Sequence, residues 1–368
     1  MKQFLKVYDV TLRACGPVFI GSGQEIGKKE YIRIPEQGKV LIPDLPGMYD
    51  FLKKRGLARA YENYLMDSKA VALFSWLRQR NIRLEDMREW TSYTLDCGDA
   101  DFDSGKQIKT FVKDAYGCPY IPGSSLKGML RTILIAGDCK GSHAYYENLK
   151  IEIWQHYKEG LKGKEYLKKE TEKLEEIAMH LARRTDKQED MVNDILSGMI
   201  VSDSRPLSVE DLTLCQKVDY HVKGRVRSLP ILRECLKPET EIHFTLSIDQ
   251  KICKITKEKL LWSIGEFAKD YYGVFSSRFS DAPKPSRNTV WLGGGAGFVS
   301  KTVLYNLFGR EQGLELVPKI FEKTGVPPEH KHNNDGSHGV SPHILKKTKY
   351  KGRAYQFGEC RIFFRELN

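Results

Sequence analysis

The sequence predicts a protein of the α+β class, because patterns typical of strands and of helices occupy separate stretches of its 368 residues. Residues 5–14 alternate apolar and polar side chains, as expected of a strand with one buried face. Between residues 45 and 90, leucine, methionine and aromatic residues recur every three to four positions, which predicts a compact helical insert. Residues 140–190 contain eleven basic and eleven acidic residues and predict a pair of solvated helices without net charge.

These patterns divide the chain into two domains and one insertion. The first domain spans residues 1–140 and includes the helical insert at about 45–90, whose aromatic residues we interpret as packing rather than as a ligand surface. In this domain, residues 5–14 and 31–34 are expected to start one sheet, with later strands at 91–95 and 107–113 and a helix from Gly123. A charged helical insertion follows at residues 141–195. The second domain, residues 196–368, has a predicted long helix at 257–272 and predicted strands at 199–202, 212–218, 241–249 and 361–364.

The charge of the chain points to a polyanionic partner. With 59 basic and 48 acidic residues, the formal net charge is +11 and the pI is near 9.1. Each phosphate that a basic side chain neutralises releases condensed counterions. The excess is local, since residues 105–131 contain five cations and one acid, and residues 340–368 contain seven cations and two acids. Two such stretches beside predicted strands suit a groove that follows a nucleic-acid backbone.

The cysteines and the hydropathy pattern exclude several classes of protein. The eight cysteines form no CxxC pair, so we expect no zinc site and no other metal or cofactor. The N-terminus has no charged-then-apolar leader pattern, and no run approaches eighteen apolar residues. We therefore expect a cytoplasmic protein with reduced thiols and no membrane partner.

Residues 120–131 have the composition of a phosphate-binding turn. A Pro-Gly pair ends an apolar strand, Ser124 or Ser125 is expected to cap the following helix, and the free amides of a first helical turn attract anions. Lys127 and Arg131 are four residues apart and therefore share one helix face. A Pro-Gly-Ser-Ser sequence alone is more often an ordinary helix start, so the phosphate interpretation depends on two further motifs.

Those motifs are two glycine-rich loops. Residues 16–23 read Gly-Pro-Val-Phe-Ile-Gly-Ser-Gly and follow the first predicted strand. Within residues 290–301, four glycines occupy five consecutive positions, which allows a ligand to approach the backbone closely. Neither loop has the spacing of a Walker A motif or of a dinucleotide fingerprint.

Together, the early strand with its Gly-Ser-Gly turn, the central Ile-Pro-Gly-Ser-Ser-Leu-Lys-Gly and the late glycine-rich loop resemble the RAMP superfamily of CRISPR proteins over most of the chain. More narrowly, residues 17–23, Glu-Tyr-Ile at 30–32 and Leu-Ile-Pro-Asp at 41–44 resemble the family of fifth subunits of type III-A Csm effector complexes. This resemblance implies tandem ferredoxin-like (RNA-recognition-motif-like) domains with helical insertions. It also implies binding of CRISPR guide RNA and a capping position at the 3' end of the guide (crRNA).

The resemblance implies partners and a hairpin as well. The partners are the backbone RAMP subunit and other Csm subunits, and a host 3'-trimming nuclease is a further possible one. In this family a basic hairpin, the thumb, presses on the guide and displaces a base. Lys223, Arg225 and Arg227 interleave with small apolar residues and predict a projecting basic hairpin. An edge hairpin whose charges prevent aggregation has the same local sequence, so both interpretations stay open.

We expect no catalytic residues. The backbone subunit of the resembled family cuts target RNA with an aspartate after its first strand region, whereas residues 21–29 of this chain contain none. Four histidines at residues 330–343 are interpreted as part of a mobile polar loop rather than as a catalytic or metal site. His221 is a candidate general base because basic residues neighbour it.

Two hypotheses result. In the first, the chain is a non-catalytic subunit that caps the backbone filament and assists crRNA maturation in antiviral defence. Phosphate contacts position RNA without reading its sequence, and here we expect them from Lys28, Lys29, Ser124, Ser125, Lys127, Arg131, Lys223, Arg225, Arg227, Gly293, Gly294, Gly295, Gly297 and Lys301. The alternative is a metal-independent endoribonuclease that processes CRISPR repeat RNA, although the sequence lacks a well-placed histidine near the first strand.

Overall fold

The computed structural model describes residues 4–102, 107–157 and 163–367 and contains two β-sheets. The five-stranded sheet has the order β11-β14-β1-β10-β7. β1 lies at its centre and pairs antiparallel with β10 and β14 on its two sides. The strands of this sheet are β1 (Leu5–Ala14), β7 (Met199–Val201), β10 (Glu241–Asp249), β11 (Thr289–Trp291) and β14 (Glu359–Glu366).

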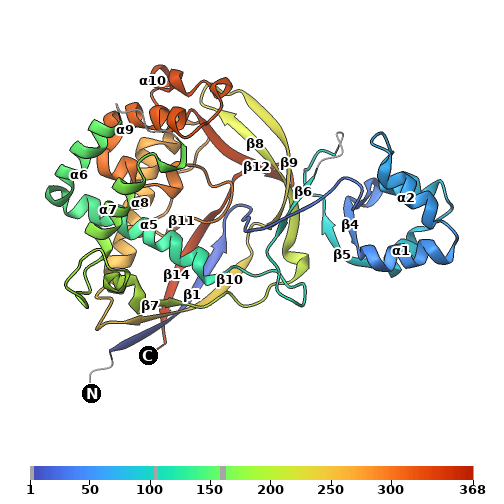
Figure 1. Ribbon diagram of the computed structural model, residues 1–368, viewed down its shortest axis with the longest axis horizontal. Helices are drawn as coiled ribbons and strands as arrows, with labels where there is room; N and C mark the ends of the chain where they lie inside the picture. The colour runs from blue at the N-terminus through green and yellow to red at the C-terminus, as the bar shows by residue number, and fades with distance from the viewer. Residues whose placement is uncertain (1–3, 103–106, 158–162, 368) are drawn as a thin grey trace.

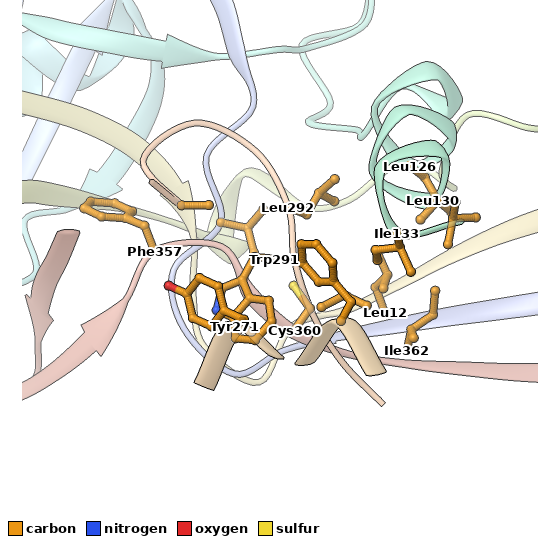
Figure 2. Close-up of a cluster of buried hydrophobic side chains, with 14 of the residues drawn as sticks. Leu12, Leu126, Leu130, Ile133, Tyr271, Trp291, Leu292, Phe357, Cys360 and Ile362 are labelled. Carbon is orange, nitrogen blue, oxygen red and sulfur yellow. The ribbon is translucent and has the colours of Figure 1, made fainter. Parts of the chain in front are cut away.

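Two long helices cover one face of this sheet. They are α5 (Gly123–Gly141) and α8 (Lys257–Val274), which pack against each other and against edge strands. Along the chain the elements run β1-α5-β7-β10-α8-β14, and the strand order 4-1-3-2 of these four strands is that of a ferredoxin-like βαββαβ unit. Figure 2 shows its core, where Leu126 and Leu130 of α5 lie near Leu12 and Ile362 of the central strands.

The second sheet has nine strands in the order β2-β6-β9-β8-β5-β4-β3, with β12 pairing with β8 and β13 pairing with β12. Its longest pair is the antiparallel hairpin of β8 and β9. The strands are β2 (Gly21–Ile26), β3 (Ile32–Ile34), β4 (Lys39–Pro43), β5 (Thr91–Asp96), β6 (Ile108–Phe111), β8 (Leu212–His221), β9 (Val226–Leu236), β12 (Ile344–Tyr350) and β13 (Arg353–Gln356). The predicted α+β class with ferredoxin-like units and helical insertions is confirmed.

Strands of the two sheets alternate along the chain. The expectation that residues 5–14 and 31–34 start one sheet is wrong, because both edges of β1 pair with strands from the second half of the chain and β3 belongs to the nine-stranded sheet. Each sheet combines strands from before residue 140 and after residue 196. The domain boundaries themselves stay a prediction.

The helical insert folds around a small core of its own. It contains α1 (Leu45–Lys54), α2 (Ala58–Met66), α3 (Leu73–Arg78) and α4 (Leu84–Glu89), drawn in blue at one side of the main body in Figure 1. Its aromatic stripe is buried: the rings of Tyr61 and Tyr64 lie 5.7 and 5.0 Å from the ring of Trp76. The interpretation of this stripe as packing is therefore confirmed.

The charged insertion also forms two helices, α6 (His143–His156) and α7 (Lys168–Met179). Both helices contact α5, and α6 also contacts α9 (Leu304–Lys323). Leu149 of α6 and Leu174 of α7 are buried. Ion pairs such as Lys173–Glu152, at 2.6 Å, lie on their outer surface. A short helix, α10 (Asp335–His338), follows α9. Within the described part of the chain, no helix has the length and apolar character needed to cross a membrane.

Candidate nucleic-acid interface

The late glycine-rich loop follows β11 and packs on the early loop after β1. The amide of Gly294 donates a hydrogen bond of 2.7 Å to the carbonyl of Phe19. A Cβ atom at Gly293, where φ is +84°, would lie 2.3 Å from that same carbonyl oxygen. These glycines thus allow the backbone of the late loop to approach the backbone of the early loop closely. Contact of Gly293, Gly294 and Gly295 with RNA stays a prediction, whereas Gly297 has open space around it.

Beside this loop lies Arg233 of β9, a residue that the sequence motifs did not reveal. A Cβ atom at Gly295, where φ is +97°, would lie 2.6 Å from its Nη1, so a side chain at this position would displace the guanidinium. The guanidinium lies 4.9 Å from the ring of Phe19 and 5.6 Å from the ring of Phe357. Its Nε and Nη1 are buried without a hydrogen-bond partner in the described structure, and burial lowers the pKa of Arg233.

Two lysines share the electrostatic environment of Arg233. Burial lowers the pKa of Lys217 to about 8, and the charges of Lys346 and Arg233 add to this effect. Burial also lowers the pKa of Lys301, although this residue reaches solvent, and Arg233 lowers it further. Among the described residues, none of Lys217, Arg233 and Lys301 forms an ion pair. We call these three residues the cation cluster, and a bound phosphate would relieve both their mutual repulsion and their desolvation.

The predicted basic hairpin is confirmed as a structural element. β8 and β9 pair up to Tyr220 and Val226, and Gly224 takes φ of +82° in the turn between them. Lys223, Arg225 and Arg227 are exposed on this tip, which extends beyond the sheet at the upper side of Figure 1. The tip also carries no ion pair among the described residues, so its three charges are available to a polyanion. Whether it displaces a guide base stays a prediction.

The start of α5 differs from the phosphate-binding turn that the sequence predicted. Neither Ser124 nor Ser125 caps the helix, so that expectation is wrong. The amide of Gly123 instead donates a 2.8 Å hydrogen bond to Oδ1 of Asp203. A Cβ atom at Gly123 would lie 2.4 Å from the carbonyl oxygen of Val201, so the chain following β7 covers this helix end.

The two cations of α5 are also close to acids. Arg131 forms ion pairs with Asp194 and, at 3.4 Å, with Glu175. Burial lowers the pKa of Lys127, while the nearby Asp194 raises it. Arg131 therefore has protein partners that a guide phosphate would need to replace, and the RNA-binding role of Lys127 and of the two serines stays a prediction.

Of the two early lysines, only Lys28 is exposed. The Nζ atom of Lys29 donates to the backbone carbonyls of Tyr64, Leu65 and Asp67 at 2.9, 2.7 and 2.7 Å. These carbonyls belong to the C-terminal end of α2, where a cation is favoured by the helix dipole. Lys29 lies between β2 and β3 of the nine-stranded sheet, so its hydrogen bonds link the helical insert to this sheet.

This geometry predicts that Lys29→Met loosens the insert. Loss of charged hydrogen bonds to helix-end carbonyls is expected to reduce the local stability of α2 by about 1–2 kcal/mol, or about 5–30-fold in its opening equilibrium. Hydrogen exchange of the α2 amides measures this change directly. Lys28→Met is the matched control, because it removes the same charge one residue away. Equal protection of α2 in both variants would contradict the assigned role.

The acids near the early loop have structural partners. Glu25 forms a 2.9 Å ion pair with Lys109, and the Glu30 carboxylate accepts a 2.6 Å hydrogen bond from the Gly27 amide. His221 accepts a 3.0 Å hydrogen bond from the Lys223 amide at Nδ1, so its lone pair there is already engaged.

The expectation of a mobile polar loop at residues 330–343 is wrong. This segment forms two turns of 3-10 helix and α10, with Asp335 and His343 buried. Within it, the buried Asp335 is bonded to His332, Ser341 and His343, which composition alone does not reveal.

The comparison with known proteins agrees with these observations. Residues 11–300 match the RAMP superfamily. Similar curated proteins named CRISPR system Cms protein Csm5 occur in Mycobacterium tuberculosis, at 29% identity with 99% of each chain covered, and in Streptococcus thermophilus, at 26% identity with 100% of each covered. The Enterococcus italicus protein of that name is 28% identical, with 98% of each chain covered.

Two solved structures share the fold. A chain of the cryo-EM structure of a Csm-crRNA-target RNA ternary complex from a type III-A CRISPR-Cas system aligns with a TM-score of 0.71 at 17% identity, covering 97% of this chain and 100% of that one. The crystal structure of T. onnurineus Csm5 aligns with a TM-score of 0.65 at 16% identity, covering 95% of this chain and 99% of that one. The match over residues 11–300, on a ferredoxin-like framework with a late glycine-rich loop, shows that this chain belongs to the RAMP superfamily.

Proposed function

We propose that this chain is a guide-RNA-binding subunit of a type III-A CRISPR interference complex, which caps the backbone filament at the 3' end of the crRNA. The full-length similarity to proteins named Csm5 and the shared fold with a chain of a Csm-crRNA-target RNA complex support this proposal. Its partners are then the guide RNA, the backbone RAMP subunit and other Csm subunits, and its place of action is the cytoplasm.

The observation that carries the proposal is the guanidinium of Arg233, whose Nε and Nη1 atoms are buried without a hydrogen-bond partner in the described structure. Buried donors without an acceptor destabilise a fold, so their presence beside a glycine-rich loop needs an explanation. Lys217 and Lys301 both lie within electrostatic range of Arg233, whose charge lowers the pKa of each. A guide phosphate in contact with this cluster would receive charge-assisted hydrogen bonds, and the exposed hairpin cations would hold the strand further along.

We propose that the subunit is not an enzyme. In the segment from β2 to β3, Glu25 forms an ion pair with Lys109 and Glu30 accepts a hydrogen bond from the Gly27 amide. Neither carboxylate is therefore free to act as a general base. At His221, the Nδ1 lone pair accepts from the backbone. These contacts disfavour the alternative of a repeat-processing endoribonuclease. The subunit would then assist crRNA maturation by protecting the bound 3' region, with trimming left to a separate nuclease.

Native purification of the tagged chain, with sequencing of the bound RNA at both ends, tests the proposal. We expect a multi-subunit complex with spacer-containing RNA. The variant Lys223→Ala/Arg225→Ala/Arg227→Ala is expected to give longer or ragged 3' ends across all spacers, because phosphate contacts carry no base information.

The matched control removes three exposed cations from the helical insert, at Lys53, Lys54 and Arg59. If both triple variants shift the 3' ends alike, the effect reflects net charge and the hairpin has no specific role. A lone protein that holds only repeat-derived product would overturn the proposal in favour of the endoribonuclease.

A further inference from the structure

A cluster of histidines surrounds one buried carboxylate at the base of the basic hairpin. Asp335, at the start of α10, has no exposed surface. Its Oδ2 accepts a 3.1 Å hydrogen bond from Nδ1 of His332, and its Oδ1 is bonded to Nδ1 of His343. The hydroxyl of Ser341 donates to Oδ2 at 2.5 Å. The carboxylate is thus held by groups that precede α10 and by groups that precede β12.

The imidazoles of this cluster are suited to bind a cation. Both oxygens of the Asp335 carboxylate accept hydrogen bonds, from the two imidazoles and from the Ser341 hydroxyl. An ionised carboxylate accepts, so both histidines donate from Nδ1 when they are neutral, and each keeps a lone pair on Nε2. Either tautomer of a neutral imidazole can ligate a metal.

A third imidazole has a buried nitrogen without a partner. Nδ1 of His338 makes no hydrogen bond in the described structure. Its ring lies 5.5 Å from that of His343. His221 also borders the cluster, at 4.7 Å from the ring of His343, but its Nδ1 is already engaged with the backbone.

We propose that His332, Asp335 and His343 form a binding site for a divalent transition-metal ion of the Zn²⁺ type. The possible ligand atoms of these three residues lie within 4.8 Å of one another. Zn²⁺ at about 2.0–2.2 Å from nitrogen and oxygen ligands needs ligand separations of about 3.3 Å, so small side-chain movements complete the site. Coordination uses the lone pair on the unprotonated nitrogen of each neutral imidazole, so it needs no oxidant and no net deprotonation of the ring.

The bound ion would restrain the motion of the basic hairpin. The site joins the segment after α9 to the start of β12, and the Val222 amide in the hairpin turn donates a 3.0 Å hydrogen bond to the carbonyl of His343. β12 itself pairs with β8 from Ile344 onward. Fixing His343 therefore restrains the hairpin turn from its base. This inference rests on the cluster alone and is independent of the proposed RNA function.

Metal titration of the full chain, after removal of any affinity tag and treatment with a chelator, tests the site. With Zn²⁺ competed against a chromophoric chelator, we expect one ion per chain at micromolar or lower concentration. His332→Gln is expected to weaken Zn²⁺ binding by at least about ten-fold, because it removes one of three protein ligands. His330→Gln is the matched control, since His330 is exposed and its ring lies 6.0 Å from that of His332.

Absence of stoichiometric Zn²⁺ uptake by the wild-type chain would overturn the proposal, as would equal binding by the two variants. If circular dichroism shows that His332→Gln is unfolded, stoichiometric Zn²⁺ uptake by the wild-type chain still tests the proposal. Co²⁺ added to the chelator-treated protein is expected to give the visible bands of a four- or five-coordinate ion, and their absence counts against the site. Metal is also expected to slow hydrogen exchange at residues 221–225, which a surface-bound ion would not do.

Discussion

Arg233→Met is expected to reduce the affinity of the protein for guide RNA by about 10–100-fold, because one charged hydrogen bond contributes about 1.5–3 kcal/mol. The free protein should unfold at the same or a higher denaturant concentration than the wild type. The Nε and Nη1 atoms of the guanidinium are buried near the rings of Phe19 and Phe357 without a hydrogen-bond partner in the described structure, so an apolar side chain of similar length removes unsatisfied donors from the folded state.

Fluorescence anisotropy with a labelled single-stranded guide RNA, at several salt concentrations, measures the effect. Loss of one phosphate contact should reduce the slope of log affinity against log salt by about 0.7. Arg365→Met is the matched control, because Arg365 is 76% exposed and pairs with Asp9 away from the cation cluster. Equal losses in the two variants would show that net charge alone is responsible. A parallel loss of stability in Arg233→Met would make Arg233 a structural residue instead.

The structure explains why the sequence revealed some of these features and not others. The helical insert and the basic hairpin depend on local patterns, namely apolar spacing for α1 to α4 and alternating cations for the β8–β9 tip, and both were predicted. The cation cluster depends on tertiary contacts. Lys217, Arg233 and Lys301 come from β8, β9 and the segment before α9, and no spacing in the sequence links them.

Tertiary contacts also changed the role of motifs that were recognised. The Pro-Gly-Ser-Ser turn does start a helix, but residues 201–203 cover its first amide. The glycine loop is a close-approach loop as predicted, yet its near neighbours are Phe19 and Arg233 of the same chain. Arg131 shares a helix face with Lys127 as expected, but Asp194 from a distant segment binds it. A composition-based interpretation of residues 330–343 failed for the same reason, because a buried aspartate organises them.

Glu234→Ala is expected to destabilise the fold by about 3–5 kcal/mol, the cost of removing one partner from a buried ion pair. The side chain of Glu234 is fully buried next to Arg233 on β9 and forms an ion pair with Lys113, whose side chain is 15% exposed. The carboxylate also accepts hydrogen bonds from the hydroxyl of Tyr93 at 2.6 Å and from the amide of Phe111 at 2.8 Å. Alanine leaves a buried ammonium, a backbone amide and a hydroxyl without their acceptor.

Urea unfolding of the purified chain measures this loss, and Glu25→Ala is the matched control. Glu25 also pairs with a lysine of the β6 region, Lys109, but the two side chains are 39% and 43% exposed. An exposed pair of this kind contributes under about 1 kcal/mol because water screens both charges. If the two variants lose similar amounts of free energy of unfolding, the Glu234 network does not hold β5, β6 and β9 together. A large loss confined to Glu234→Ala would instead show that this network fixes the strand that carries Arg233, and so holds the cation cluster in place.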